Sequence, residues 1–276
     1  MLITDAQVHV WAAHTPERPW PADGNAHTQS AIPLAAPELI AEMDKAGVDR
    51  CVLVPPSWEG DRNDVALAAV AAYPDRFRVM GRINAGDASN AALLPTWKQQ
   101  PGMLGIRLTL LPQHRHWLFD GTCDWFWPAA EAAGVPVYML PPDQIPAIDR
   151  IAERHPGLKI VIDHLSIPTH KRDAEAIEHI RQVLPLALRP NVAVKASALP
   201  CYTTQGYPFP MLTDALKAVF DAFGPRRMFW GSDLSRLPCT YRQCVTHFTE
   251  ELPFLKGEDL DLVMGGAVCD WLGWTA

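Results

Sequence analysis

The sequence predicts an α/β protein in which eight strand–helix units close into a single-domain (β/α)8 barrel. Short β-branched runs alternate eight times with longer helical patterns, which is the order of parallel βα units. The length of 276 residues suits one such barrel, and the G-x-G-x-x-G turn of an open dinucleotide-binding sheet is missing. With 48% hydrophobic residues, the chain can bury a large core without a disulfide or metal.

The positions of the strands and helices are predicted from the period of the hydrophobic residues and from residues typical of helix and strand ends. We expect strands at Ile3–Val10, Arg50–Val54, Arg78–Ile83, Met103–Leu108, Val135–Met139, Lys159–Ile162, Asn191–Lys195 and Met228–Trp230. We expect helices at Pro37–Ala46, Asp64–Tyr73, Ala88–Gln99, Thr122–Ala133, Asp143–Arg154, Ala174–Leu186, Met211–Phe223, Tyr241–Leu252 and Asp259–Leu272. Gly47, Gly134 and Gly224 end three of these helices, as glycine does at a C-cap.

Three long irregular stretches interrupt this order, and Pro, His, Trp and Tyr are frequent in them. Ala12–Pro33 and Leu199–Pro210 directly follow predicted strands, and the third stretch is Thr109–Gly121. Connections that follow the strands lie at the face of a barrel where active sites form. We therefore expect these stretches to cover an active site; the alternative is ordinary surface loops held by their aromatic residues.

The amino-acid composition limits which classes of binding partner the protein is expected to have. The net charge is −7 and no basic run occurs, which argues against nucleic-acid binding. No run of about 18 apolar residues is present, so no membrane-spanning helix is expected, and the first residues lack a signal-peptide pattern. The six cysteines form no C-x-x-C pair and are expected to be free thiols of a cytoplasmic protein. A homo-oligomer is compatible with these observations.

A polar face is predicted on the first strand. Asp5, Gln7, His9 and Trp11 alternate along it, so a two-residue period places them on one side. Polar groups on one face of an apolar strand must be hydrogen-bonded or functional, because burying them unpaired costs free energy. Taken alone, His9 fits a hydrogen-bonded core histidine.

Ionisable side chains lie at the ends of four further strands. Arg107 lies in the fourth strand, Asp163 and His164 follow the sixth, Lys195 ends the seventh, and Asp233 follows the eighth. The strands of a parallel barrel present these ends on one face, and buried charges are costly unless they are paired. Such a gathering predicts a functional pocket rather than a structural accident.

These residues also carry a family resemblance. Nearly the whole chain resembles the amidohydrolase-related TIM-barrel family, through Asp5-x-x-x-His9-x-Trp11, Val161-Ile162-Asp163-His164-Leu165, Lys195-x-Ser197 and Gly231-Ser232-Asp233. Within that family the likeness is to lactonases of the 2-pyrone-4,6-dicarboxylate type and to sugar lactonases, with aromatic-acid decarboxylases as further relatives. The resemblance implies one TIM-barrel domain over residues 1–276 and a hydrolase that opens a cyclic ester.

The resemblance also implies a metal site, and the chain departs from it. The family's usual ligands are two histidines on the first strand, one on the fifth, and the aspartate after the eighth. Here Gln7 replaces the first histidine, and Met139 or Leu140 stands at the fifth-strand position. A neutral carboxamide is a poor zinc ligand. We therefore expect a metal-independent site, as the pyrone dicarboxylate lactonases imply, with one Zn²⁺ at His9, His164 and Asp233 as the alternative.

The expected reaction is hydrolysis of a small anionic lactone ring. Asp233 is expected to act as the general base that takes a proton from water. The developing oxyanion needs donors, and His9, His164 and Lys195 are the candidates. Two other classes stay open: a zinc-dependent hydrolase or non-oxidative decarboxylase of the same family, and a binding barrel without catalysis.

Four further residues are expected to contact the substrate. Arg107 is predicted to hold a substrate carboxylate by a bidentate contact. Trp11 is expected to give an apolar wall for the ring, together with loop aromatics. Gln7 on the first strand and Arg236, just after the Asp233 turn, complete the predicted set.

Overall fold

Eight parallel strands form the centre of the protein in the computed structural model, which describes residues 1–20, 33–110 and 112–275. The strands are β1 (Thr4–Val8), β2 (Arg50–Leu53), β3 (Phe77–Gly81), β4 (Met103–Thr109), β5 (Val137–Leu140), β6 (Ile160–Ile162), β7 (Val192–Ser197) and β8 (Met228–Gly231). Each strand pairs with the next in chain order. The backbone N–H of Asp233 donates to the carbonyl of Gln7 at 3.0 Å and joins the two edges. The predicted (β/α)8 barrel is confirmed.

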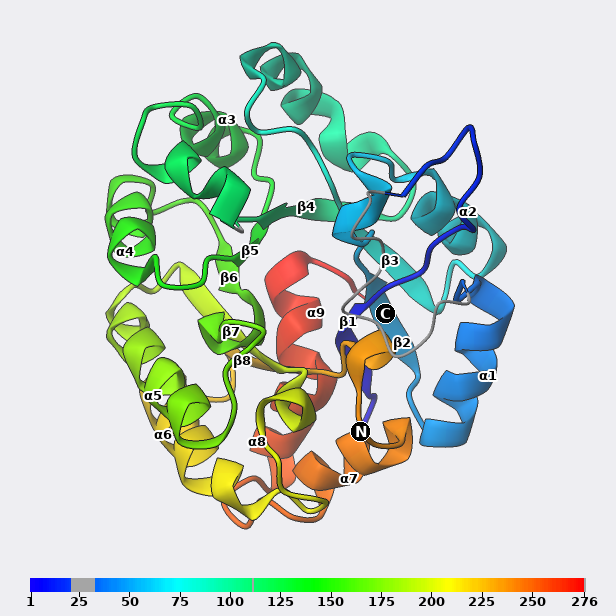
Figure 1. The fold of residues 1–276 in the computed structure, drawn as a ribbon, viewed down its shortest axis with the longest axis vertical. Helices are drawn as coiled ribbons and strands as arrows, with labels where there is room; N and C mark the ends of the chain where they lie inside the picture. The colour runs from blue at the N-terminus through cyan, green and yellow to red at the C-terminus, as the bar shows by residue number, and fades with distance from the viewer. Residues whose placement is uncertain (21–32, 111, 276) are drawn as a thin grey trace.

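Helices surround these strands as a ring. Figure 1 shows α9 near the centre of this ring of helices. The α-helices are α1 (Ala36–Ala46), α2 (Asp64–Ala72), α3 (Phe126–Ala132), α4 (Ile145–Arg154), α5 (Asp173–Val183), α6 (Thr213–Phe223), α7 (Tyr241–Thr249), α8 (Gly257–Asp261) and α9 (Ala267–Leu272). Among the residues described, no helix has the length and apolar character needed to cross a membrane.

Several predicted elements differ from the observed ones; the predicted helix Thr122–Ala133, for example, begins only at Phe126. Residues Ala88–Gln99 form 3-10 rather than α-helix, and Pro95 inside this segment cannot donate an α-helical hydrogen bond. The predicted last helix is interrupted by a π-helical turn at Leu262–Gly266. The first strand ends at Val8, before the predicted Val10. Of the predicted loop Ala12–Pro33, residues 21–32 lie outside the described part of the chain.

The apolar core has two layers. One fills the space between the strands and the surrounding helices, and Val8 and Val10 belong to it. The other fills the barrel and packs on the C-terminal segment, with Ala6 on β1, Phe229 on β8 and Val268 on α9 among its members. This inner layer leaves the carboxyl ends of the strands for polar side chains, which is where the candidate site lies.

Asp5 fastens the junction between β1 and β8. Its carboxylate accepts hydrogen bonds from the backbone N–H groups of Gln7 and Ser232, each at 2.9 Å, and from the Tyr241 hydroxyl at 2.7 Å. The pairing of β1 with β2 is irregular between Asp5 and Val8, so strict alternation along the strand is lost. Asp5 therefore bonds to α7 and to the backbone of the junction, and its role here is structural.

Removing the Tyr241 hydroxyl should weaken this junction. Burial raises the pKa of Asp5 from 3.8 to about 6. The folded state therefore binds the carboxyl proton of Asp5 more tightly than the unfolded state does. The contribution of Asp5 to the free energy of unfolding falls as the pH rises from about 3.8 to about 6. Tyr241→Phe removes a donor to the charged form and raises the pKa further. We expect the variant to lose about 1–3 kcal/mol of unfolding free energy, and more at about pH 8 than at about pH 5.

Urea unfolding at the two pH values measures this loss. Tyr207→Phe is the matched control, because the half-buried Tyr207 hydroxyl donates to Thr246 at 2.9 Å away from the junction. Equal losses in the two variants, or no dependence on pH, would contradict the role given to Asp5.

Candidate active site

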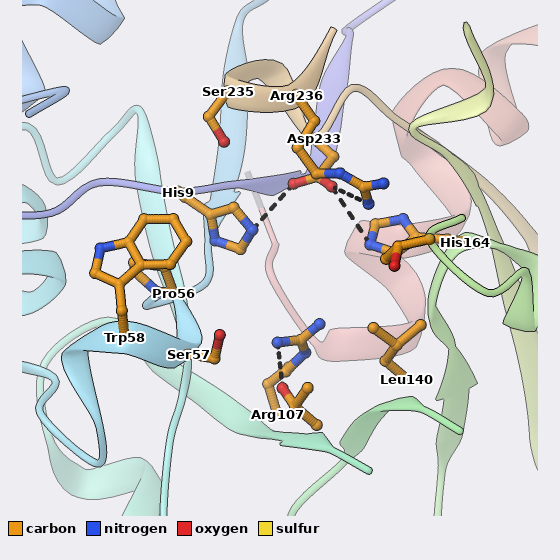
Figure 2. A pocket seen from close by; sticks show the side chains of 12 residues that line it. His9, Pro56, Ser57, Trp58, Arg107, Leu140, His164, Asp233, Ser235 and Arg236 are labelled. Carbon is orange, nitrogen blue, oxygen red and sulfur yellow. Dashed lines mark hydrogen bonds and ion pairs between the residues drawn. The ribbon is translucent and has the colours of Figure 1, made fainter. Parts of the chain in front are cut away.

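A cavity that is partly open to solvent lies at the carboxyl ends of the strands. Its ionisable lining comes from residues within or after four strands, as Figure 2 shows: His9, Arg107, His164, Asp233 and Arg236. Its apolar lining includes Pro56, Trp58 and Leu140. The predicted gathering of ionisable side chains at one end of the barrel is thus present.

Sharp backbone turns aim two of these side chains. His164 has φ 52° directly after β6, and Asp233 has φ 54° directly after β8. Residues other than glycine seldom adopt this left-handed conformation, because it crowds the Cβ atom. His164 lies inside the short turn Asp163–Ser166 that follows β6, and Asp233 lies between β8 and the 3-10 turn Leu234–Arg236.

His9 and Asp233 form a close pair. His9 Nε2 lies 3.0 Å from Asp233 Oδ1, and His9 Nδ1 lies 2.6 Å from the carbonyl oxygen of Val54. An acceptor thus faces each ring nitrogen, and an imidazole can donate from both nitrogens only in its protonated form. Burial alone would raise the pKa of Asp233, but His9 and Arg236, whose Nη1 is 3.2 Å from Oδ2, hold that pKa well below its usual value. Asp233 is therefore ionised at neutral pH.

A second polar chain runs beneath the cavity. The Lys195 ammonium lies 2.7 Å from Asp163 Oδ1 and also donates to Gln7 Oε1. The Gln7 amide nitrogen lies 3.3 Å from His164 Nε2, and His164 Nδ1 lies 2.8 Å from Ser197 Oγ. Burial lowers the pKa of His164 to about 3, so this ring is neutral.

Lys195 is enclosed in the barrel. Its side chain is fully buried, and the ammonium lies 3.7 Å from the centre of the Tyr138 ring. Burial lowers the pKa of Lys195 to about 8, although Asp163 opposes the shift. Neither Lys195 nor Gln7 lines the cavity. The structure therefore places both residues beneath the cavity, and their expected contacts with substrate or oxyanion stay predictions.

Arg107 reaches the cavity while bonded to the barrel. Its Nε donates to Asp163 Oδ2 at 3.1 Å, and its Nη1 donates to the Thr109 hydroxyl. Arg82, which sequence reasoning missed, donates to the same hydroxyl at 3.1 Å. Burial and then the charge of Arg107 lower the pKa of Arg82 to about 9. Two guanidinium groups thus donate to one hydroxyl, and Arg107 also pairs with the carboxylate of Asp163.

Among the residues that the structure describes, positive side chains outnumber negative ones at and beneath the cavity. Arg107, Lys195 and Arg236 give three positive charges, whereas Asp163 and Asp233 give two negative ones. An excess of buried or half-buried positive charge favours binding of an anion.

The aromatic wall comes from a different tryptophan than predicted. Trp58 lines the cavity, whereas Trp11 lies behind it, with ring centres 5.6 Å apart and planes at 83°. The neighbouring Glu59 is buried, accepts from the N–H of Ala12 at 3.0 Å and pairs with Arg18. The segment after β1 therefore supports the wall from outside. In the sequence, the Pro55-Pro56 pair after β2 is the feature that could have indicated an apolar wall at this position.

The alternative zinc site at His9, His164 and Asp233 does not fit the donors that are present. Among residues 1–20, 33–110 and 112–275, no group of three or more His, Cys, Asp or Glu side chains is arranged to hold a metal ion. Gln7 turns its amide nitrogen, not its oxygen, toward His164. Leu140 lines the cavity at the end of β5, and the Arg236 guanidinium occupies one side of Asp233. These groups oppose a cation there.

Comparison with known proteins is consistent with the barrel. A family model described as amidohydrolase matches residues 4–266. The chain is similar to an L-fucono-1,5-lactonase of Burkholderia ambifaria, with 29% identity over 247 residues that cover 84% of this chain and 81% of the relative.

Solved structures with the same fold cover almost the whole chain. An amidohydrolase from Burkholderia multivorans with bound zinc has 20% identity and a TM-score of 0.83, with 99% of each chain covered. A probable 2-pyrone-4,6-dicarboxylic acid hydrolase from Acinetobacter baumannii with citric acid bound has 20% identity and a TM-score of 0.77, with 99% of this chain and 100% of that chain covered.

Proposed function

The chain belongs to the amidohydrolase family, and from this premise we propose that it is a hydrolase that opens a small carboxylated lactone. One observation carries the proposal: an ionised aspartate and a cluster of cations share one small cavity. Figure 2 shows the guanidinium of Arg107 pointing toward the space between His9, His164 and Asp233. A carboxylate held by Arg107 leaves the ring of the substrate facing Asp233.

The reaction begins with the transfer of a proton from water to Asp233. The water oxygen attacks the carbonyl carbon of the lactone and forms a tetrahedral oxyanion. The His9 imidazolium and the Arg236 guanidinium supply positive charge to that oxyanion. The ring C–O bond then breaks, and the leaving oxygen takes the proton back from Asp233. The product is an open-chain acid that carries the freed oxygen as a hydroxyl group.

The surroundings of the cavity support an anionic ring as the substrate. The excess positive charge needs a counter-charge, and Trp58, Pro56 and Leu140 give an apolar surface for a ring. A relative of this chain bears the name of a lactonase, and a structural neighbour binds citric acid. A small carboxylated lactone meets both requirements.

Asp233→Asn should remove the base and leave the fold intact. We expect kcat for hydrolysis of a carboxylated lactone to fall by at least about a hundredfold, because a carboxamide cannot take the proton from water. Stopped-flow or pH-stat assays with purified protein measure the rate, and circular dichroism checks the fold. Turnover close to that of the wild type on the best substrate would refute the assignment.

Arg107→Met should separate charged from neutral substrates. A charge-assisted contact of roughly 1.5–3 kcal/mol corresponds to about a tenfold to hundredfold rise in KM for a carboxylated lactone. A neutral lactone of the same ring size should be much less affected. Because Arg107 also bonds to Asp163, thermal melting must accompany the kinetics. Equal losses for both substrates, or a loss of stability alone, would make Arg107 a structural residue.

We also propose that the enzyme works without a metal ion. The reasons are the amide of Gln7 facing His164 and the guanidinium beside Asp233. We expect substoichiometric zinc in purified protein and full activity after chelation. Elemental analysis and assays before and after dialysis against a chelator test this. About one tightly bound divalent ion per chain, with activity lost on its removal, would overturn the proposal.

A further inference from the structure

The contact between Lys195 and Gln7 fixes how the Gln7 amide is turned. An ammonium group has only donors, so the Gln7 atom that it meets must be the carbonyl oxygen. The amide nitrogen therefore points the other way, toward His164 Nε2 at 3.3 Å. Asp163 holds the ammonium from its far side at 2.7 Å, so the amide is not free to turn over.

This orientation decides which nitrogen of His164 carries the proton. The Gln7 amide nitrogen is a donor, so His164 Nε2 must accept. The proton then lies on Nδ1, which donates to Ser197 Oγ at 2.8 Å. The opposite tautomer would set two N–H groups against each other at His164 Nε2. Burial, which lowers the pKa of His164 to about 3, keeps the ring from carrying both protons.

The tautomer matters because His164 Nε2 lies 3.5 Å from Asp233 Oδ2. A proton on that nitrogen would add a second donor to this oxygen, which already accepts from Arg236 Nη1 at 3.2 Å. With the proton on Nδ1, both atoms are acceptors, and Asp233 Oδ2 keeps a lone pair for a water proton. Two acceptors at this distance repel each other, so the arrangement persists only while other groups fix it.

We propose that Gln7 is a positioning residue: clamped by Lys195, it locks His164 in the Nδ1–H tautomer and so keeps Asp233 available as the base. The proposal rests on the hydrolase function argued above. It replaces the expected role of His164 as an oxyanion donor, because a ring nitrogen without a proton cannot donate. It also gives the fully buried Lys195 and Gln7 a function without direct contact with substrate.

Gln7→Glu is the sharpest test, because it changes one amide group into an oxygen. The new carboxylate still accepts from Lys195 but no longer donates to His164, and it accepts a proton from Nε2 instead. We expect ¹⁵N NMR of the imidazole nitrogens to show Nδ1–H for His164 in the wild type and Nε2–H in the variant. We expect kcat to fall about tenfold to a hundredfold, with little change in KM, because residue 7 does not line the cavity.

A second variant separates the tautomer from the added charge. Lys195→Met introduces no carboxylate but removes the clamp on the Gln7 amide, so the proposal expects His164 to lose its single tautomer here too. Gln144→Glu is the matched control: Gln144 is buried and donates to the carbonyl of Leu110 at 2.9 Å, and it contacts none of these residues. We expect it to keep the His164 tautomer and the turnover of the wild type.

The outcomes distinguish the two proposals. An Nε2–H tautomer in the wild type, or an Nδ1–H tautomer that survives both Gln7→Glu and Lys195→Met, would overturn the role of Gln7 whatever the activity. The predicted tautomers together with no hydrolysis of any lactone by the wild type would instead refute the proposed function and leave the tautomer lock standing.

Discussion

The carboxylate of Asp163 is where the charged groups of the barrel interior meet. It is fully buried, and its two oxygens pair with Lys195 and Arg107. Removing one partner from a buried ion pair typically costs about 3–5 kcal/mol, because the other charge is left unpaired. Since one carboxylate serves two cations, it fixes both at once: Arg107 at the cavity and Lys195 below it. The orientation of the Gln7 amide follows from the second of these contacts.

Positive charge in this barrel is thus arranged in two tiers. His9, Arg107 and Arg236 lie at the cavity, where a substrate can meet them, whereas Lys195 lies beneath and acts only on protein groups. The tiers differ in what they can contribute to a reaction. Groups in the upper tier can stabilise charge that develops on a substrate, whereas the lower tier can only orient the groups above it.

The sequence predicts the barrel and also predicts at which end of the barrel the site lies. Parallel strands bring their carboxyl ends to one face whatever their side chains are. The sequence does not predict which side chains reach the cavity. Trp11 was expected there by a two-residue period, but pairing is irregular between Asp5 and Val8, and Trp58 takes the position. The burial of Lys195 depends on the direction of the Asp163 side chain. The two-residue period of a strand does not predict that direction.

The glutamine at position 7 is best understood together with Lys195 rather than as a lost metal ligand. Its neutral amide satisfies two different needs: an acceptor for Lys195 and a donor for His164. A side chain with only one of these capacities would leave a buried polar group unpaired, at a cost of about 1–3 kcal/mol. The pair therefore forms one polar unit, and a change at either position should alter His164 before it alters the walls of the cavity.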